Sequence, residues 1–596
     1  MKWILVIVLC CWSNLSQAQA TMLMDIDLFY KDRNQIKVRF TPPIFSQANA
    51  IYIFTPSDNL TDIPSSTLPI ISFKLSYKNG QVNYLTTKRN GEFQIDKINE
   101  VETIEYIFDC DQLHSNIYKA SNTILHKDKI AILHFINFIG YFKEYQDLRL
   151  QPKIRFTNFS NHLVTTDYIQ ANNNTLILEP KTYVELLGKI AMISNEKTTH
   201  FNLGVDSFHI TYYSDNKSIN ESKFINTIKA ITTIAIPYIQ PLSKNNYHFV
   251  FYLSYKNQES EHGHGGMTNE NSSFFYININ QEEEIIYAEL EHTLLHELLH
   301  QICPGKIKSY EAVTSYQINN SYSQHLWMYE GLIDYLTIKL LLHNHLISSE
   351  NFFHQMRHKI MQMNRFPPIS LSKLSERIFT IQNKQLHNLF YSKGALIAMC
   401  LDLFLINESN GNRDIWGFLN YLEAKYGTHR YFRDEDLWLD LEKYSAAWIA
   451  HETKKCVIKK NYLPIEQALY YIGYDYANTN SISVYKYGDF SIQLQNDKKS
   501  IIVKNVGINS LNLINDDRII EINNQQLNEK NYSELSTKLI LPKYNEEIKI
   551  SLQRNAQTIK MEAKAIKSKH QIRYVIVANP YANAYQKKLQ YKFLGQ

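Results

Sequence analysis

The sequence lacks a strong excess of charge of either sign. Its 62 Lys and Arg residues nearly balance 58 Asp and Glu residues, the formal net charge is +4, and no Lys/Arg block stands out. Proteins that bind nucleic acid or an acidic membrane surface through charge gather basic residues in a patch or a run. The electrostatics imply neither partner, and we expect no nucleic acid.

Long apolar runs are also missing. The stretches 3–12 and 130–142 are both shorter than the ~20 residues that a membrane-spanning helix needs. The first follows Lys2 and precedes the small-x-small sequence Ala18-Gln19-Ala20, which is typical of a secretory signal peptide and its cleavage site. We therefore predict a signal peptide over 1–20, a secreted or periplasmic protein, and no stable membrane insertion.

Cysteine is scarce. Once the predicted signal peptide is removed, Cys110, Cys303, Cys400 and Cys456 remain, and they are widely separated. Disulfide-stapled scaffolds and cysteine-based zinc sites both need several cysteines at close spacing. The pattern excludes both, while one disulfide stays open without an assignable pairing.

The composition is that of a folded protein too long for one core. Hydrophobic residues make up 44% and charged residues 20% of the 596 residues. Single hydrophobic cores stop growing near ~250–300 residues, so about two to four domains are expected. We find no internal repeat and no low-complexity tract.

The pattern of strand-like and helical segments predicts a multidomain protein. Short β-rich runs separated by Asn, Ser and Asp turns indicate an N-terminal all-β sandwich over 21–202. Strand-like runs followed by long helical stretches indicate an α+β domain over 203–459, with a helical half. β-periodic runs then return and predict a small β domain over 460–575, followed by a tail at 576–596.

The segment His296-Glu297-Leu298-Leu299-His300 has the spacing of a zinc site. On a helix, His296 and His300 project from one face, so both imidazoles can hold a single zinc ion. Glu297 is then placed beside the water that the metal activates. The alternative is a coincidental match to the motif on an amphipathic helix. A zinc site also needs a third protein ligand, which the motif does not supply.

Glu330 is the leading candidate for that ligand, because two histidines and a glutamate form one established set for catalytic zinc. It opens a second predicted helix, and Asp334 lies one turn on, where it could accept a hydrogen bond from a ligating histidine. Taken alone, Glu330 would more often be a solvated helix residue. Three nearby residues stay open as alternatives, although the first is better placed to support the site: His292, His325 and Glu291.

Three segments together carry a family resemblance. They are the His296–His300 motif, Trp327–Tyr335 and Tyr391–Asp402. Their order and spacing resemble the glycyl aminopeptidase family of PDZ-containing zinc metallopeptidases. That family is part of the gluzincin group and is similar in its active site to aminopeptidase N and thermolysin. The resemblance implies a thermolysin-like (gluzincin) catalytic domain with Glu330 as third ligand, one Zn2+ per chain, and a peptide or protein substrate.

The resemblance also implies roles that the residues alone would not give. Tyr391, otherwise interpreted as a core aromatic, is expected to donate its hydroxyl to the oxyanion. The expected reaction is peptide-bond hydrolysis by a zinc-activated water with Glu297 as general base. Lys393 and Asp402 are expected to be structural.

The chain departs from the family just before the zinc helix. The family has Gly-Gly-x-Glu-His in its substrate-binding segment, whereas this chain has Gly265-Gly266-Met267-Thr268-Asn269, followed by Glu270. Thr268 stands where the family has the glutamate that holds the free α-amine. Either Glu270 anchors the amine in a shifted pocket, or, as we expect, the anchor is lost and internal or blocked bonds are accepted. His262 and His264 could form a second metal site, although a loop His-x-His is more often solvated.

The third domain resembles the PDZ domain of the same family. The segment 488–494 stands at the carboxylate-binding loop, and 511–524 resembles the PDZ core with Asn512, Asp516 and Asn524 in place of glycines. Asn and Asp tolerate the left-handed backbone, so the turns can survive. Such a groove would bind a peptide C-terminus by strand addition, and the alternative is an inert β-rich cap.

A second function therefore stays open. The chain could be a catalytically weak or inactive peptide-binding protein that keeps zinc structurally and acts through its PDZ-like domain. The presence of Glu297 argues against this function, because a structural zinc site needs no base beside an open coordination position.

Overall fold

The computed structural model describes residues 21–596 apart from a set of gaps. These gaps are 55–68, 87–90, 116–122, 128, 146–147, 157–167, 173–174, 188, 216–218, 243–244, 256–263, 270, 319–321, 379–385, 428–429, 461, 496–497, 541, 544 and 556. The predicted signal peptide at 1–20 lies outside the described residues. The chain divides into two compact units: unit 1 is Met1–Gly473 with Ala582–Gln596, and unit 2 is Tyr474–Tyr581.

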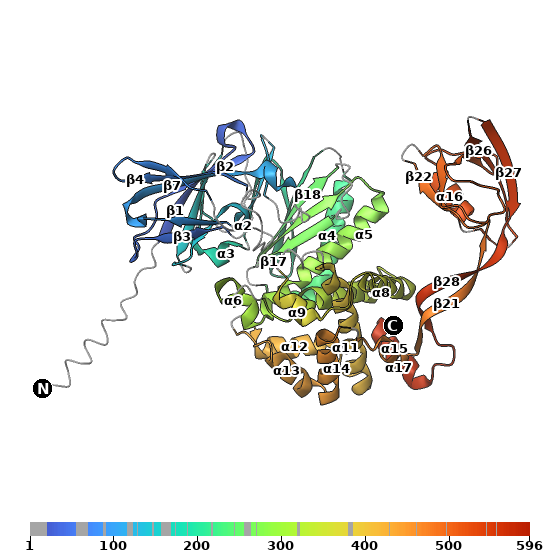
Figure 1. Ribbon diagram of the computed structural model, residues 1–596. Coiled ribbons are helices and arrows are strands. Elements are labelled where there is room, and N and C mark those ends of the chain that lie inside the picture. Colours follow the sequence, from blue (N-terminus) through green and yellow to red (C-terminus); the bar gives the residue numbers. More distant parts are fainter. Residues whose placement is uncertain are drawn as a thin grey trace. The chain divides into compact units, whose positions relative to one another are not determined.

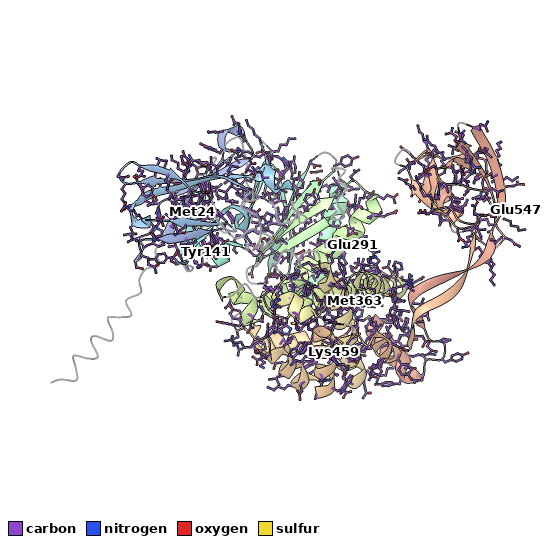
Figure 2. The ribbon with its side chains drawn as sticks, in the orientation of Figure 1. Met24, Tyr141, Glu291, Met363, Lys459 and Glu547 are labelled. Atoms are coloured by element: carbon purple, nitrogen blue, oxygen red, sulfur yellow. The ribbon has the colours of Figure 1, made fainter. Side chains whose placement is uncertain are left out.

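Unit 1 contains a β-rich N-terminal region, drawn in blue in Figure 1. A nine-stranded sheet and a three-stranded sheet share one core there. Alternate side chains of the first strand, among them Met24, which Figure 2 labels, point into that core. The larger sheet consists, in order, of β12 (Tyr168–Asn172), β13 (Thr175–Leu178), β11 (Arg149–Arg155), β1 (Thr21–Leu28), β2 (Gln35–Phe40), β7 (Val101–Asp109), β4 (Ile70–Tyr77) and β5 (Val82–Tyr84), with β14 (Lys181–Thr182) beside β11. The smaller sheet consists of β10 (Tyr141–Phe142), β3 (Ala50–Ile53) and β6 (Glu92–Ile95).

The middle of unit 1 is built on a five-stranded sheet. Three central strands run parallel, and an antiparallel strand closes each edge. The order is β16 (Thr198–Leu203), β17 (Asp206–Ser214), β18 (Asn246–Ser254), β20 (Ser272–Asn278) and β19 (His264–Thr268). Since β16 begins at Thr198, this sheet starts slightly before the boundary that the sequence predicts at residue 202.

The two faces of this sheet are covered differently. Helices α4 (Glu221–Ile239) and α5 (Glu283–Leu299) pack together on one face, as Figure 1 shows, and Phe224 of α4 contacts Phe251. Alternate residues such as Val250 point to the other face, where they pack against a small sheet. That sheet is formed by β8 (Ile124–His126), β9 (Ile130–His134) and β15 (Ile190–Ser194). This small sheet packs against both the N-terminal core and the five-stranded sheet.

The rest of unit 1 is helical. Its central helix is buried on all sides from Ala395 to Ile406. The stretch Phe390–Glu408 is, among the described residues, the one helix long and apolar enough to cross a membrane, and 89% of its apolar window is buried inside the protein. The helices are α6 (Tyr310–Ile318), α7 (Ile333–His343), α8 (Ser349–Met363), α9 (Leu371–Glu376), α11 (Ala395–Glu408), α12 (Ile415–Lys425), α13 (Asp436–Tyr444), α14 (Ala447–Ile458) and α15 (Ile465–Tyr470).

The C-terminal residues differ from the predicted tail. They form α17 (Ala584–Leu594), which returns to unit 1 and begins with a capping box at Asn583. Leu589 and Phe593, four residues apart, are buried on one face, and the main-chain oxygen of Phe593 lies 2.9 Å from His343 Nε2. The short apolar stripe of this helix explains why it docks instead of remaining solvated.

Unit 2 has its own core, made by a β-sheet and helix α16 (Tyr532–Ile540). The sheet order is β22 (Ser491–Leu494), β23 (Ile501–Lys504), β24 (Arg518–Ile522), β26 (Glu547–Arg554) and β27 (Gln557–Lys564), with β25 (Gln525–Gln526) beside β24. A separate ribbon pairs β21 (Tyr474–Lys486) with β28 (Ile566–Ala578). The residues that stand in place of family glycines adopt left-handed backbone: φ is 50° at Asn512, 71° at Asp516 and 61° at Asn524.

The four cysteines of the described chain are buried free thiols. The structure therefore shows no disulfide among Cys110, Cys303, Cys400 and Cys456 in the residues it describes.

Candidate metal centre and active site

Helix α5 carries the zinc-type motif at its C-terminal end. Its leucines, including Leu294 and Leu298, are fully buried, so the same helix turn that packs against the core also fixes the histidine face. His296 and Glu297 are each only 6% exposed, and His300 follows at the helix end. The rings of His296 and His300 lie 4.7 Å apart between centroids and are nearly perpendicular.

Glu330 lies opposite these two imidazoles, in the wide turn η7 (Trp327–Leu332) that leads into α7. Its Oε2 is 3.6 Å from His296 Nε2 and 3.8 Å from His300 Nε2. The same Oε2 is buried and makes no hydrogen bond. Ligands about 2.0–2.1 Å from a tetrahedral zinc are separated by roughly 3.3 Å from one another. The two distances from Glu330 Oε2 therefore come within about 0.5 Å of the separation that ligands of one zinc ion would have.

The surroundings of Glu330 and Asp334 favour the ionised form of each carboxyl group, and a carboxyl ligates zinc in that form. Burial alone would raise the pKa of the Glu330 carboxyl, but contact with His296 and the charges of His300, His296 and His387 together lower it to about 2. Asp334 behaves in the same way: burial opposes ionisation, yet Lys359 and His292 hold its pKa well below the usual range.

Each histidine has a polar group on the side of its Nδ1, hydrogen-bonded in His300 and at 4.0 Å in His296. His300 Nδ1 lies 3.1 Å from the main-chain oxygen of Cys303, so in the neutral ring Nδ1 donates this hydrogen bond and Nε2 has the lone pair that can ligate a metal. His296 Nδ1 lies 4.0 Å from Asp334 Oδ1, and the same oxygen lies 3.3 Å from His292 Nε2. His292 thus sits behind the site, where it contacts Asp334.

Glu297 is packed beneath the edge strand β19. A Cβ atom added to Gly266 would lie 2.4 Å from Glu297 Cγ, so only glycine lets the strand pass this close to the carboxylate. Ligand atoms of His296, Glu297 and His300 lie within 4.8 Å of one another. Burial raises the pKa of the Glu297 carboxyl, which strengthens it as a proton acceptor.

The remaining residues of the predicted substrate segment have different outcomes. Thr268 Oγ1 donates to the main-chain oxygen of Glu297 at 2.9 Å and lies 2.7 Å from Ser273 Oγ. The hydroxyl of Thr268 is therefore already engaged in hydrogen bonds within the protein. Gly265 and Met267 lie on β19 and are partly exposed, whereas Glu270 lies outside the described residues. The same holds for His262 and for the side chain of His264.

Tyr391 lies in a second wide turn, η8 (Phe390–Gly394). Its ring centroid is 5.7 Å from that of His296 and 5.7 Å from that of His387. Sequence reasoning missed His387, although its spacing of four residues before Tyr391 places both on one helix face. Burial lowers the pKa of His387, and its charge interacts with that of Glu330.

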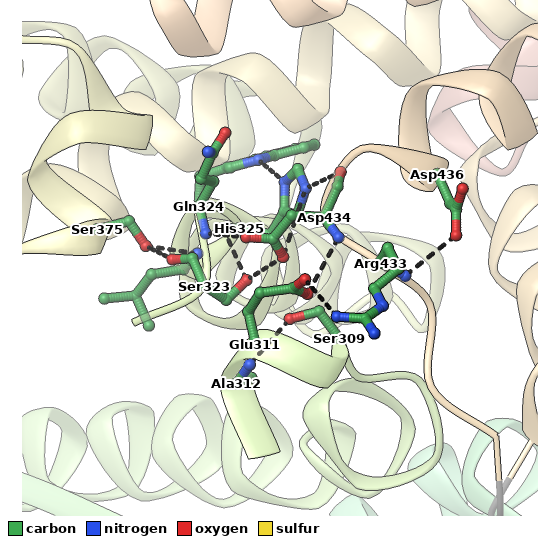
Figure 3. A network of polar contacts seen from close by, with 12 residues as sticks. Ser309, Glu311, Ala312, Ser323, Gln324, His325, Ser375, Arg433, Asp434 and Asp436 are labelled. Carbon is green, nitrogen blue, oxygen red and sulfur yellow. Dashed lines mark hydrogen bonds and ion pairs between the residues drawn. The ribbon is translucent and has the colours of Figure 1, made fainter. Parts of the chain in front are cut away.

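Two of the alternative ligands lie away from the metal centre. His325 is completely buried in the polar network of Figure 3, where its Nε2 donates to the main-chain oxygen of Asp434 at 2.8 Å. Its Nδ1 accepts a hydrogen bond from Trp327 Nε1 at 3.2 Å. Glu291, labelled in Figure 2, lines a groove with residues of α4. Neither side chain is available to complete the site.

Known proteins resemble this chain in two respects, a family model over one segment and the overall fold. Residues 289–397, which contain His296, Glu330 and Tyr391, match the family model described as M61 glycyl aminopeptidase. A search of curated protein sequences finds no match. The fold resembles an aminopeptidase N family protein from Idiomarina loihiensis, with a TM-score of 0.66, 15% identity, and coverage of 96% of this chain and 100% of that one. An M1 zinc metallopeptidase from Deinococcus radiodurans gives a TM-score of 0.42 at 12% identity, covering 75% and 94%.

Two histidines and two glutamates gathered at one place, within a segment that matches the M61 glycyl aminopeptidase model, define a metallopeptidase. Its catalytic segment is glycyl aminopeptidase-like.

Proposed function

We propose that this protein is a zinc-dependent peptidase that binds one zinc ion through His296, His300 and Glu330. The main support for this proposal is the position of Glu330 Oε2. It lies within 3.8 Å of the Nε2 atoms of His296 and His300 and makes no hydrogen bond. Zinc in such a set supplies a Lewis acid and lowers the pKa of water to about 7. Glu330 is preferred to Glu297 as third ligand because its Oε2 faces both imidazole nitrogens and has no other partner.

The remaining residues divide the reaction between them. Glu297 takes the proton of the attacking water and delivers it to the leaving amine, a role that suits a carboxyl with a raised pKa. The hydroxyl of Tyr391 donates to the oxygen on which negative charge develops. Asp334 Oδ1 lies 4.0 Å from His296 Nδ1, and closing this distance to a hydrogen bond would hold the ring in its ligating orientation.

The substrate class follows from Thr268. A free α-amine needs a carboxylate partner, and the hydroxyl of Thr268 carries no charge and already donates to the main chain of Glu297. Among the described residues around the site, Glu330 and Asp334 face histidines and Lys359, so neither is free to hold an amine. We therefore infer that the amine anchor is lost and that the enzyme accepts internal or N-blocked peptide bonds.

One comparison tests this function. Zinc content is measured first, and a peptide is then compared with its N-acetylated form as substrate, with Glu297→Gln as the inactive control. We expect one zinc per chain and cleavage of both peptides. Cleavage confined to the free amine, and abolished by Glu270→Gln, would restore a strict aminopeptidase with a shifted anchor. Absence of zinc would overturn the proposal as a whole.

A further part of the proposal concerns unit 2 and export. We infer that unit 2 is PDZ-like, because its edge strand β22 has one unpaired side in the described sheet, and three positive-φ residues stand in the place of family glycines. It would then add a peptide C-terminus as a strand. If the zinc-loaded protein cleaved no peptide but bound one through unit 2, the peptide-binding alternative would replace the enzyme.

Export rests on the sequence of residues 1–20. We propose cleavage after Ala20 and a secreted or periplasmic mature protein without stable membrane insertion. The N-terminal sequence of the protein recovered from its host tests this, and a chain that retains residues 1–20 would contradict it.

A further inference from the structure

Lys359 is a buried cation that no motif of the sequence singles out. It lies on α8, is 9% exposed, and forms an ion pair with Asp334 Oδ2. Its Nζ also donates to the main-chain oxygen of Tyr391 at 3.0 Å. One ammonium group therefore touches two elements of the site, α7 and the turn η8.

The contacts of Asp334 show what the ammonium group does. The carboxylate is nearly inaccessible, with 4% of its side chain exposed, so its charge must be compensated inside the protein. Lys359 holds Oδ2, which leaves Oδ1 facing His292 at 3.3 Å and His296 Nδ1 at 4.0 Å. Without Lys359, Oδ2 would lose its cation, and the carboxylate could rotate away from His296.

We propose that Lys359 is a positioning residue. It holds the carboxylate of Asp334, which lies behind His296, in a fixed position relative to the turn that carries Tyr391. The proposal rests on the proposed function, because it assigns His296 to the metal and Tyr391 to the oxyanion. An ammonium group suits this task, since its donors can point to a carboxylate and to a main-chain carbonyl at the same time. Lys359 touches no reacting atom and acts through these two neighbours.

A second buried lysine provides a matched control. Lys339 is 1% exposed and lies 2.5 Å from Asp402 Oδ2, which also accepts from Tyr335 Oη at 2.5 Å. The other oxygen of Asp402 accepts from the main-chain nitrogen of Ile415 at 2.9 Å. None of these contacts involves a metal-site residue. Lys339 therefore has the burial and pairing of Lys359 without its connection to the site.

The experiment compares Lys359→Met with Lys339→Met in the full chain. Zinc affinity is measured by competition with a chromophoric chelator, and stability is measured by thermal unfolding of the metal-free protein. We expect Lys359→Met to weaken zinc binding by roughly 10- to 100-fold, the usual loss when an outer partner of a metal ligand is removed. Lys339→Met should lower the unfolding temperature at least as much, with zinc affinity changed by less than about threefold.

Peptide hydrolysis supplies the second readout. Lys359→Met should lower kcat more than it raises KM, and the losses of Lys359→Met and Tyr391→Phe should be less than additive, because both act through one turn. Lys359→Arg keeps the charge and should recover part of the loss. If a Met variant fails to fold, the Arg variants at 359 and 339 replace the pair in the zinc measurement.

The outcomes separate this proposal from the proposed function. Equal effects of the two lysines on zinc affinity, or fully additive losses with Tyr391→Phe, would overturn the positioning role while leaving the enzyme intact. A wild-type protein that binds zinc but cleaves no peptide would refute the peptidase. The chelator competition would in that case still decide whether Lys359 holds His296 in place.

Discussion

The metal centre and the network around His325 both border the turn that carries Glu330, and they differ in how their polar atoms are satisfied. Both ring nitrogens of His325 have partners, and Asp434 accepts from Ser323 Oγ at 2.8 Å and from the nitrogen of Gln324 at 2.7 Å (Figure 3). In the metal centre, His296 Nδ1 and Glu330 Oε2 are buried without a hydrogen bond.

This difference separates the two clusters by how completely their buried polar atoms are hydrogen-bonded. Buried polar atoms left unpaired cost about 1–3 kcal/mol each, and a metal ion held by Glu330 would give its unpaired Oε2 a partner. The closed network of His325 and Asp434 holds the start of η7 in place, whereas the open cluster of His296, His300 and Glu330 leaves Glu330 Oε2 without a hydrogen bond. The following predictions test whether the contrast holds, beginning with the largest expected effect.

Removing a ligand from the open cluster should abolish zinc binding. We expect His296→Ala and Glu330→Ala to lose the metal and all measurable peptidase activity, because a catalytic zinc is held by three protein ligands. Metal analysis of the purified variants checks this. His325→Gln is the matched control and should keep one zinc per chain. Loss of zinc in the control would erase the contrast between the two clusters.

Glu297→Gln should separate binding from chemistry. The amide keeps the shape of the buried side chain but cannot take a proton, so we expect a loss of about 10²–10⁴ in kcat with zinc retained. Steady-state kinetics and metal analysis on the same sample measure both. Full activity in this variant would contradict the assigned mechanism.

Tyr391→Phe should give a smaller loss than either change above. Removal of one oxyanion donor lowers kcat by roughly 10²–10³, and the Phe ring can keep the packing against His296. Zinc content and unfolding temperature should stay close to the wild type. An unchanged kcat would return Tyr391 to the role of a core aromatic.

The closed network should respond in stability and not in chemistry. His325→Phe would leave the main-chain oxygen of Asp434 and the indole of Trp327 without partners, at a cost of about 2–4 kcal/mol in unfolding free energy. Urea unfolding measures it, and zinc stoichiometry should not change. A stable variant with weakened zinc binding would show that the network serves the metal directly.

The sequence predicts the parts of the site that follow from helical spacing. His296 and His300 share a face because they are four residues apart, and Asp334 follows Glu330 by the same step. Glu330 was a candidate from the chemistry of zinc ligand sets, and the family resemblance strengthened it, since no spacing rule links the two helices. The open and closed histidine clusters look alike in sequence, because partners such as Asp434 lie more than a hundred residues away.

The parts that sequence reasoning missed depend on tertiary contacts. Lys359 reaches Asp334 from another helix, and the use of Thr268 depends on a main-chain oxygen of Glu297. At the level of the fold, strand-rich and helical regions were predictable from periodicity. The docking of α17 was not, because its apolar stripe is only a few residues long.

The smallest expected effect is a change in the pH dependence of stability, and it concerns a histidine that is buried without any hydrogen-bond partner on its ring. His134 at the end of β9 is 1% exposed, neither ring nitrogen has a hydrogen-bond partner, and its ring contacts Phe274 at 5.1 Å between centroids. Burial lowers its pKa to about 3. Below pH ~6.5, His134 is protonated in the unfolded chain but stays neutral in the folded protein. The free energy of unfolding therefore decreases as the pH falls from about 6.5 toward 3.

His134→Leu should remove this acid sensitivity without removing a hydrogen bond. At pH 5 the penalty is about 2 kcal/mol, since each pH unit below ~6.5 contributes about 1.4 kcal/mol. The difference in unfolding free energy between pH 7.5 and pH 5 should accordingly shrink by about 2 kcal/mol in the variant, measured by urea unfolding. The same change at the exposed residue His200 serves as the matched control. If the difference in unfolding free energy between pH 7.5 and pH 5 is the same in His134→Leu as in the wild type, the buried ring of His134 is not the source of the acid sensitivity.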